Sequence, residues 1–179
     1  MFGKKRGRNG KKPGPPVHDD LVERDFSATA PNTLWLADIT EHWTREGKLY
    51  VCAIKDVYSI ALAHRSAEGA DVAGCVLHTD RGAQFRSRKL VHQLNRHQMA
   101  GSMGRVGAAG DNAAMESFFS LLQKNVLDRR VWNTREELRI AIVTWIERTY
   151  HRRRRQAALG RLTPVEYELI MTTTATQAA

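Results

Sequence analysis

The sequence predicts an α/β fold in which strands come first and helices make up the last third. Short apolar runs of strand length occur before residue 80, each bounded by turn-forming residues. Apolar residues at helical intervals of three and four dominate after residue 110. With 179 residues, the chain is long enough to bury the core of one domain. None of its apolar runs approaches the ~20 residues that a membrane-spanning helix needs.

The two ends of the chain are predicted to lie outside the core. Residues 1–17 combine many Lys and Arg with Gly and Pro, and they hold almost no apolar side chains. We therefore expect a flexible basic arm and linker over residues 1–30, either a solvated linker or a tail that contacts phosphates. No apolar segment follows this basic start, which excludes a secretory signal peptide. The core is expected over residues 31–171, with a disordered Thr/Ala-rich tail over 172–179.

Three apolar stretches in the first half of the chain indicate strands. Thr33–Ile39 and Leu49–Ile54 flank the turn residues Glu46–Lys48, so they are predicted to form a hairpin. The run Ala73–Leu77 is continuously apolar, which is typical of a strand buried on both faces. Between them, residues 60–65 fit a short helix, although this segment is the hardest to interpret.

The second half of the chain carries helix signals. Apolar residues on one face predict a helix over Arg86–His97, and a short strand is expected over Gly101–Arg105. Asp111 fits the N-cap of a helix that ends near Asp128. Thr134 opens a further helix through a capping box, and Thr163 followed by Pro164 marks another helix start.

Charge and cysteine content narrow the class of protein. The formal net charge is +9 and the pI about 10.0, which favours a polyanionic partner such as nucleic acid. Cys52 and Cys75 both lie in apolar stretches, without the spacing of a zinc site, so we expect free thiols in a reducing compartment. The densest run of positive charge is a set of four consecutive arginines, Arg152, Arg153, Arg154 and Arg155, which is either a solvated helix end or a phosphate-binding segment.

Three carboxylates stand at the ends of predicted elements. Asp38 lies in the first strand, Asp80 follows the third, and Glu116 lies near the start of a helix, with 35 residues between it and Asp80. A single acid in such a place is more often a turn former, a cap or a solvated side chain. Convergent Asp and Glu oxygens, however, are the ligands with which proteins hold divalent cations that act on phosphates. In a basic chain, the set suggests metal-dependent chemistry on nucleic acid.

Three motifs in fixed order carry a resemblance to a known family. They are WLADIT at Trp35–Thr40, HTDRGAQF at His78–Phe85 and DNAAMESFF at Asp111–Phe119, together with a closing segment from Tyr150 to Tyr167. Over roughly residues 30 to 170 the chain resembles the integrase-like catalytic core of bacterial insertion-sequence transposases of the DDE type. The 35-residue interval between the second and third acids is similar to that of the family.

The resemblance implies a fold and a metal site. It predicts a ribonuclease-H-like mixed sheet with flanking helices. Asp38, Asp80 and Glu116 are then the catalytic triad and the ligands of two ions, Mg²⁺ or Mn²⁺. It also implies DNA as a partner, self-association or a companion transposase subunit, and a place in the bacterial cytoplasm at the nucleoid, away from membranes.

Residues near the third acid are expected to contact DNA. Asn112 lies one helical turn before Glu116 and is expected to touch DNA or to orient that carboxylate. The family usually has a basic residue seven positions after the Glu. Here that position is Gln123, so the role is assigned to the next residue, Lys124. The arginines from Arg152 to Arg155 complete the predicted DNA-binding set.

The chain departs from the family in two places. It begins in the basic linker, without the helix-turn-helix region that reads the ends of the element. The interval between Asp38 and Asp80 is also short, so that one edge strand and most of the first helix are expected to be missing. Leu49–Ile54 would then become an exposed sheet edge, which favours association and a marginally stable fold.

Two functional hypotheses follow. In the first, the chain is a DNA transposition or integration core that catalyses metal-dependent DNA strand cleavage and transfer. In the second, it is a non-catalytic remnant that binds DNA or transposase subunits. Motif order favours the family, whereas the shortened interval between Asp38 and Asp80 leaves the activity open.

Overall fold

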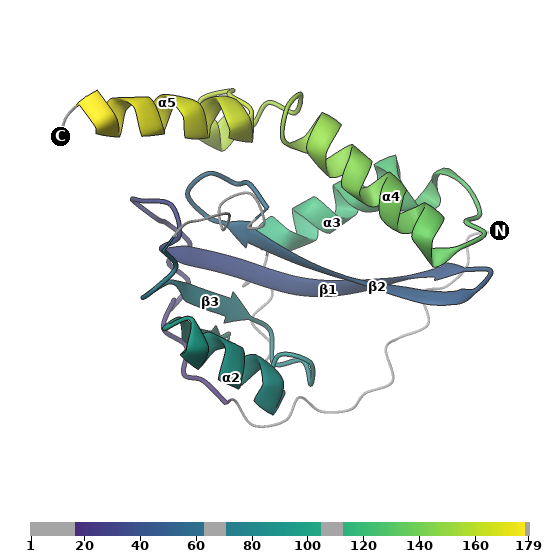
Figure 1. The fold of residues 1–179 in the computed structure, drawn as a ribbon, viewed down its shortest axis with the longest axis horizontal. Helices are drawn as coiled ribbons and strands as arrows, with labels where there is room; N and C mark the ends of the chain where they lie inside the picture. Colours follow the sequence, from purple (N-terminus) through teal and green to yellow (C-terminus); the bar gives the residue numbers. More distant parts are fainter. Residues whose placement is uncertain (1–16, 63–70, 105–112, 178–179) are drawn as a thin grey trace.

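A four-stranded mixed sheet forms the centre of the molecule (Figure 1). The computed structural model describes residues 17–62, 71–104 and 113–177. Strand order is β2-β1-β3-β4; β2 pairs with β1 antiparallel, whereas β3 pairs in parallel with both β1 and β4. The strands are β1 (Leu34–Thr44), β2 (Gly47–Asp56), β3 (Val76–Thr79) and β4 (Ala100–Met103).

Helices cover both faces of this sheet (Figure 1). They are α2 (Arg88–Arg96), α3 (Ala113–Asn125), α4 (Arg135–Trp145) and α5 (Pro164–Gln177). The predicted α/β class with a helical last third is therefore confirmed. Helix α5 continues to Gln177, within the segment expected to be a tail. Over the described ranges, no helix is long and apolar enough to cross a membrane.

Alternation along β1 explains why the two faces carry different helices. Leu34 and Leu36 point to the larger core, which they share with α3 and α4 through residues such as Phe118. Trp35 and Ala37 point to a smaller core on the opposite face, which includes Leu94 of α2. Because successive side chains of a strand alternate, one strand builds both layers.

The predicted helix starts match the described helices where they can be compared. The Thr134 hydroxyl accepts the Glu137 N–H at 3.0 Å, and the Glu137 carboxylate accepts the Asn133 N–H at 3.1 Å. Thr163 and Glu166 form a second reciprocal pair. The predicted cap Asp111 lies outside the described residues.

Strand β2 is an open edge of the sheet, as the sequence predicted. In the described part of the chain, its outer side meets only the bridge between Lys55 and Leu62. Beside β2 lies an apolar groove of about 620 Å³ whose lining includes Val51, Phe118 and Ile142. The association and marginal stability expected from this edge stay predictions.

The predicted short helix over 60–65 is wrong for residues 60–62, which form no helix and return beside the end of β2. Ile60 has a φ of 60°, and Leu62 bridges Lys55. The C-terminal third holds this return in place, since the Tyr150 hydroxyl donates to the Ile60 carbonyl and the His151 Nε2 accepts the Leu62 N–H at 3.1 Å. Tertiary hydrogen bonds thus override the local helix preference. Residues 63–65 of the predicted helix lie outside the described ranges.

Part of the predicted N-terminal linker packs on the sheet instead of forming a free tether. Val22 is buried in the larger core. The Leu21 N–H donates to the Ser102 hydroxyl at 3.0 Å, and Phe26 packs edge-on against His78 at 5.7 Å between ring centroids. Burial of Val22 and the ring contact of Phe26 offset the chain entropy that is lost when this segment becomes ordered.

Asp56 makes the tight turn that follows β2. It is fully buried, and its carboxylate accepts three backbone N–H groups, from Asn32 at 2.7 Å, Tyr58 at 2.7 Å and Ser59 at 3.3 Å. These three bonds give Asp56 a structural role. They let the chain reverse within a few residues of the strand end.

Replacing Asp56 with Ala is expected to lower the free energy of unfolding by at least about 3 kcal/mol, because three N–H groups lose their acceptor. Urea unfolding followed by circular dichroism measures the change. Asp71→Ala is the matched control, since the exposed Asp71 accepts a single N–H, from Ala73. Equal losses in the two variants would contradict the assigned role of Asp56.

Candidate active site

Asp38 and Asp80 lie side by side because of the parallel pairing of β1 and β3. In that register Ala37 is opposite Thr79, and each aspartate is the next residue along its strand. Neighbouring strands lie about 4.8 Å apart, so the two acids start from adjacent backbone positions. The structure therefore brings together two of the three predicted catalytic residues.

Both acids also continue the side of the sheet that carries α3. Leu36 and Val76 contribute to the core beneath that helix. Side chains an even number of residues apart on a strand point to the same face of the sheet. Asp38 follows Leu36 by two residues and Asp80 follows Val76 by four, so both acids point to the face that carries α3. Asp38 is half-buried and Asp80 is exposed, which places the pair at the rim of this core.

The Asp80 carboxylate is oriented by the turn that follows it. Its Oδ1 accepts the Gly82 N–H at 2.8 Å. A Cβ at position 82 would lie 2.8 Å from that same oxygen, so this close approach requires glycine. The Asp38 Oδ1 accepts the N–H of Ile39 at 2.7 Å. Hard carboxylate oxygens from two adjacent residues fit the preference of Mg²⁺ or Mn²⁺.

Glu116 stands in the first turn of α3 and is exposed, while Met115, Phe118 and Leu122 form the buried face of the helix. Within the described ranges, no three His, Cys, Asp or Glu residues are grouped so that they could hold a metal ion. The convergence of Glu116 on the aspartate pair stays a prediction. Asn112, predicted to assist it, lies outside the described residues.

Lys55 is a buried residue beside this site that the sequence interpretation missed. Its ammonium donates to the Ala114 carbonyl at 3.3 Å and so ties β2 to the first turn of α3. Burial lowers the pKa of Lys55 to about 8. The sequence could have predicted this burial. Lys55 lies two residues after Ala53 and four after Val51, so on a strand it points to the same inward face as they do.

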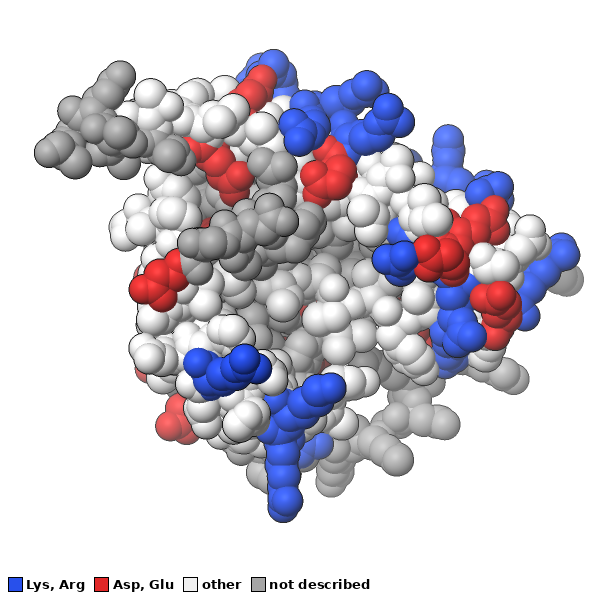
Figure 2. Space-filling model, in the orientation of Figure 1, with Lys and Arg blue, Asp and Glu red and all other residues white. Residues whose placement is uncertain are grey.

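The predicted DNA-binding residues in the described ranges are exposed. Lys124 lies in the last turn of α3, and Arg152 to Arg155 follow α4. Figure 2 shows Lys and Arg side chains gathered over the junction of α4 and α5. Arg155 is paired there with Glu166 at 3.6 Å.

Comparison with known proteins finds a family model and similar sequences. The family model "Integrase core domain" matches residues 97–164. The InsF transposase of insertion sequence IS3A from Escherichia coli K12 is 35% identical over 173 residues, which cover 87% of this chain and 60% of the relative. The IS600 31 kDa protein of Shigella sonnei is 34% identical over 171 residues, which cover 85% and 62%. The chain is therefore similar to insertion-sequence transposases over most of its length, and its match to the integrase core lies at residues 97–164.

Solved structures support the fold of this chain. The catalytic core of HTLV-2 integrase, solved with magnesium, superposes with a TM-score of 0.53 at 16% identity, covering 79% of this chain and 99% of that one. A simian T-cell lymphotropic virus intasome chain gives a TM-score of 0.51 at 15% identity, covering 76% and 54%. Integrase catalytic cores have the ribonuclease-H-like fold, so the predicted fold class is confirmed.

The alignment with InsF also bears on chain length. This chain spans about 60% of the length of that curated relative. The alignment runs over 173 residues but covers only 87% of the 179 residues here. Some aligned residues of the relative therefore have no counterpart in this chain, which agrees with the predicted internal shortening.

Lys55→Met is expected to remove a pH dependence of stability. In the wild type, the pKa of Lys55 is about 8 in the folded state and 10.5 as the ordinary value. Between these values the unfolded chain binds more protons, so the contribution of Lys55 to the free energy of unfolding rises with pH and is most unfavourable below pH 8. The stability of the variant relative to wild type should therefore fall by about 3 kcal/mol from pH 7.5 to 10.5.

Chemical denaturation at several pH values measures this difference. Lys48→Met is the control, because Lys48 lies on the same strand and bonds Glu41 at the surface. The difference in the free energy of unfolding between Lys48→Met and the wild type should stay nearly constant up to pH 10. Parallel stability curves for the wild type and Lys55→Met would rule out the role of the buried amine.

Proposed function

We propose that this chain is the catalytic core of a DNA transposase that cleaves and transfers DNA strands with a divalent metal. The observation that carries the proposal is the adjacency of Asp38 and Asp80 on parallel strands, within a chain similar to insertion-sequence transposases. Asp38 is half-buried and Asp80 is exposed, so the pair lies at the rim of the α3 core, where a metal ion and a DNA phosphate could reach it.

The two aspartates and Glu116 are proposed to hold Mg²⁺ or Mn²⁺, with two ions expected. When bound, such ions neutralise the charge that develops on the phosphate and activate the attacking oxygen. Asp38 supplies oxygens from within β1, and Asp80 supplies them from the end of β3. Gly82 fixes the orientation of the Asp80 carboxylate, which limits the reorganisation needed on binding.

The reaction proposed is phosphoryl transfer in two displacements. In the first, a water oxygen bonds to phosphorus, the bond between phosphorus and the 3′ oxygen breaks, and the water proton passes to solvent. The released 3′ hydroxyl then attacks a phosphodiester of a second DNA segment, with release of that segment's own 3′ oxygen. Asn112, Lys124 and the arginines Arg152 to Arg155 are proposed to hold the DNA backbone during these steps.

The proposed partners are DNA and either a second copy of this chain or a companion transposase subunit. Net charge of +9 supports the first. An unpaired β2 edge with an apolar groove beside it supports the second. The activity of the whole transposase is part of the same proposal, because the chain spans only part of its relatives.

A non-catalytic DNA-binding or subunit-binding role is the second candidate function. The observation that favours it is that Glu116 does not form a metal-binding group with the aspartate pair in the described structure. Under this alternative, DNA binding persists and cleavage does not depend on the acids.

A nicking assay on supercoiled plasmid with Mn²⁺ separates the two candidates. Asp80→Asn and Glu116→Gln are each expected to lower the rate at least about 100-fold, because loss of a metal ligand removes several kcal/mol of transition-state stabilisation. The matched controls Asp71→Asn and Glu41→Gln change exposed acids away from the site and should nick at the wild-type rate. If the wild type nicks no faster than Asp80→Asn, the catalytic proposal fails and the binding role remains.

A further inference from the structure

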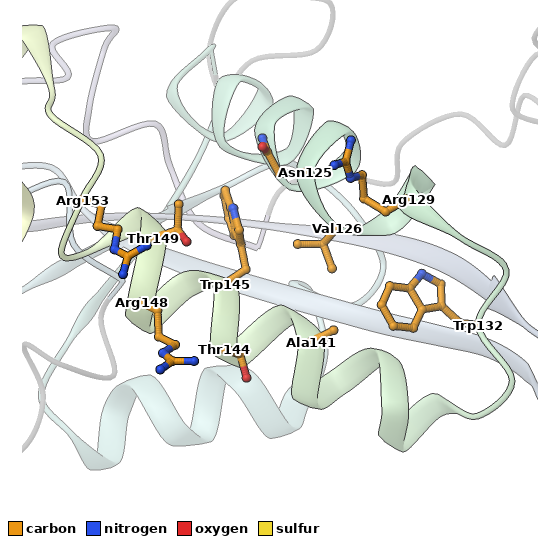
Figure 3. A pocket seen from close by; sticks show the side chains of 10 residues that line it. All are labelled: Asn125, Val126, Arg129, Trp132, Ala141, Thr144, Trp145, Arg148, Thr149 and Arg153. Atoms are coloured by element: carbon orange, nitrogen blue, oxygen red, sulfur yellow. The ribbon is translucent and has the colours of Figure 1, made fainter.

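A second site with the chemistry of a nucleotide pocket lies between the end of α3 and the second half of α4 (Figure 3). Its volume is about 530 Å³, within the range of ligand pockets. The lining combines guanidinium groups, indole rings and hydroxyls, and it contains no acidic residue: Asn125, Val126, Arg129, Trp132, Ala141, Thr144, Trp145, Arg148, Thr149 and Arg153.

The three arginines of this pocket differ from other arginines nearby. Arg130, Arg135, Arg139 and Arg155 each pair with a glutamate, at 2.7, 3.8, 2.6 and 3.6 Å. Among the ion pairs found in the described residues, none involves the pocket arginines Arg129, Arg148 and Arg153. Charge is therefore neutralised at those four positions, whereas the pocket arginines and the neighbouring Arg152 and Arg154 keep theirs, which favours an anionic ligand.

The backbone at the end of α4 brings two of these arginines to one side. Residues Ile146–Tyr150 form a π-turn, with bonds between residues five apart from His151 N–H to Ile146 O and from Arg154 N–H to Thr149 O. In a regular α-helix, Arg148 and Arg153 would be rotated by about 140° from each other. The wider turn reduces that rotation, and π-turns recur at functional sites for this reason.

Trp145 supplies an aromatic surface in the same pocket. One side of its ring packs against Phe118 and Tyr150, at centroid distances of 6.2 and 5.8 Å. The residue is only half-buried, and Figure 3 shows its indole reaching from α4 toward α3 across the pocket. A half-buried indole that is held in place by two aromatic neighbours is suited to stacking with a nucleobase.

The pocket is separate from the aspartate pair. Asn125 follows Glu116 by nine residues on α3, which corresponds to about 13.5 Å along the axis and about 180° of rotation. DNA held there lies on the other side of α3 from the Glu116 side chain.

We propose that this pocket binds an unpaired nucleotide of a DNA strand, with its phosphate on Arg148 and Arg153 and its base on Trp145. The inference rests on the proposed function only in taking DNA as the polyanion.

Binding of a fluorescein-labelled oligothymidylate in EDTA tests the phosphate contacts without any cleavage. Fluorescence anisotropy is measured over a range of NaCl concentrations. The double variant Arg148→Gln/Arg153→Gln should bind about 10-fold more weakly and flatten the slope of log affinity against log salt by about 1.4, since each phosphate contact of a single strand contributes about 0.7. Arg135→Gln/Arg139→Gln removes the same charge from paired arginines and should keep the wild-type slope.

The base contact has its own readout. Wild type should bind the oligothymidylate about 10-fold more tightly than an abasic oligomer of equal length, because the abasic strand has no base to stack. Trp145→Leu should lose this preference while keeping the salt slope. Circular dichroism melting checks that Trp145→Leu folds, and the arginine variants test the pocket if it does not.

The outcomes separate this site from the catalytic proposal. Equal salt slopes in the two arginine double variants, or no binding of wild type in EDTA, would overturn the pocket. Asp80→Asn should bind the oligonucleotide as wild type does, because its defect lies in cleavage. A chain whose nicking ignores Asp80 but whose binding depends on Arg148 and Arg153 would retain the pocket and lose the catalytic role.

Discussion

The parallel pairing of β1 with β3 is the constraint on which the rest of the structure depends. It joins segments that are about 40 residues apart in the sequence, at a point where neither strand is an edge. Both faces of the pair are covered, by α3 and α4 on one side and α2 on the other. Burial on both faces fixes the register, since a slip of one residue would reverse every side chain. The neighbouring positions of Asp38 and Asp80 are a direct result of that fixed register.

Buried polar groups then hold the shortened edge of the sheet to this centre. Asp56 closes the turn after β2, and His151 and Tyr150 bind the returning segment at Leu62 and Ile60. Lys55 ties the same strand to α3. These contacts hold β2 and the segment after it to the rest of the sheet. Their cost is that each buried group must keep its partner, because an unpaired one is expensive.

Local patterns in the sequence predicted the strands and the capped helices, whereas the open β2 edge was predicted from the short interval between Asp38 and Asp80 in comparison with the family. Alternation and capping boxes depend on residues close together in the chain, so Thr134 and Thr163 marked helix starts without knowledge of the fold. The return at residues 60–62 and the packing of Val22 escaped prediction because long-range contacts decide them. The candidate site divides in the same way. Motif order indicated Asp38 and Asp80, whereas the pocket draws Arg129 and Arg148 from elements that only the fold brings together.

The π-turn at the end of α4 shows that the number of residues in a turn can determine the direction of surface side chains, even where the side chains themselves are unchanged. An α-turn and a π-turn differ by one residue, so a chain that lacked a single residue within 146–150 would regain regular helix geometry. If that residue were Thr149, such a chain would keep every arginine and the same net charge. It would nevertheless present Arg148 and Arg153 in different directions. Among relatives with matching motifs, the spacing between these two arginines is therefore more informative than their presence.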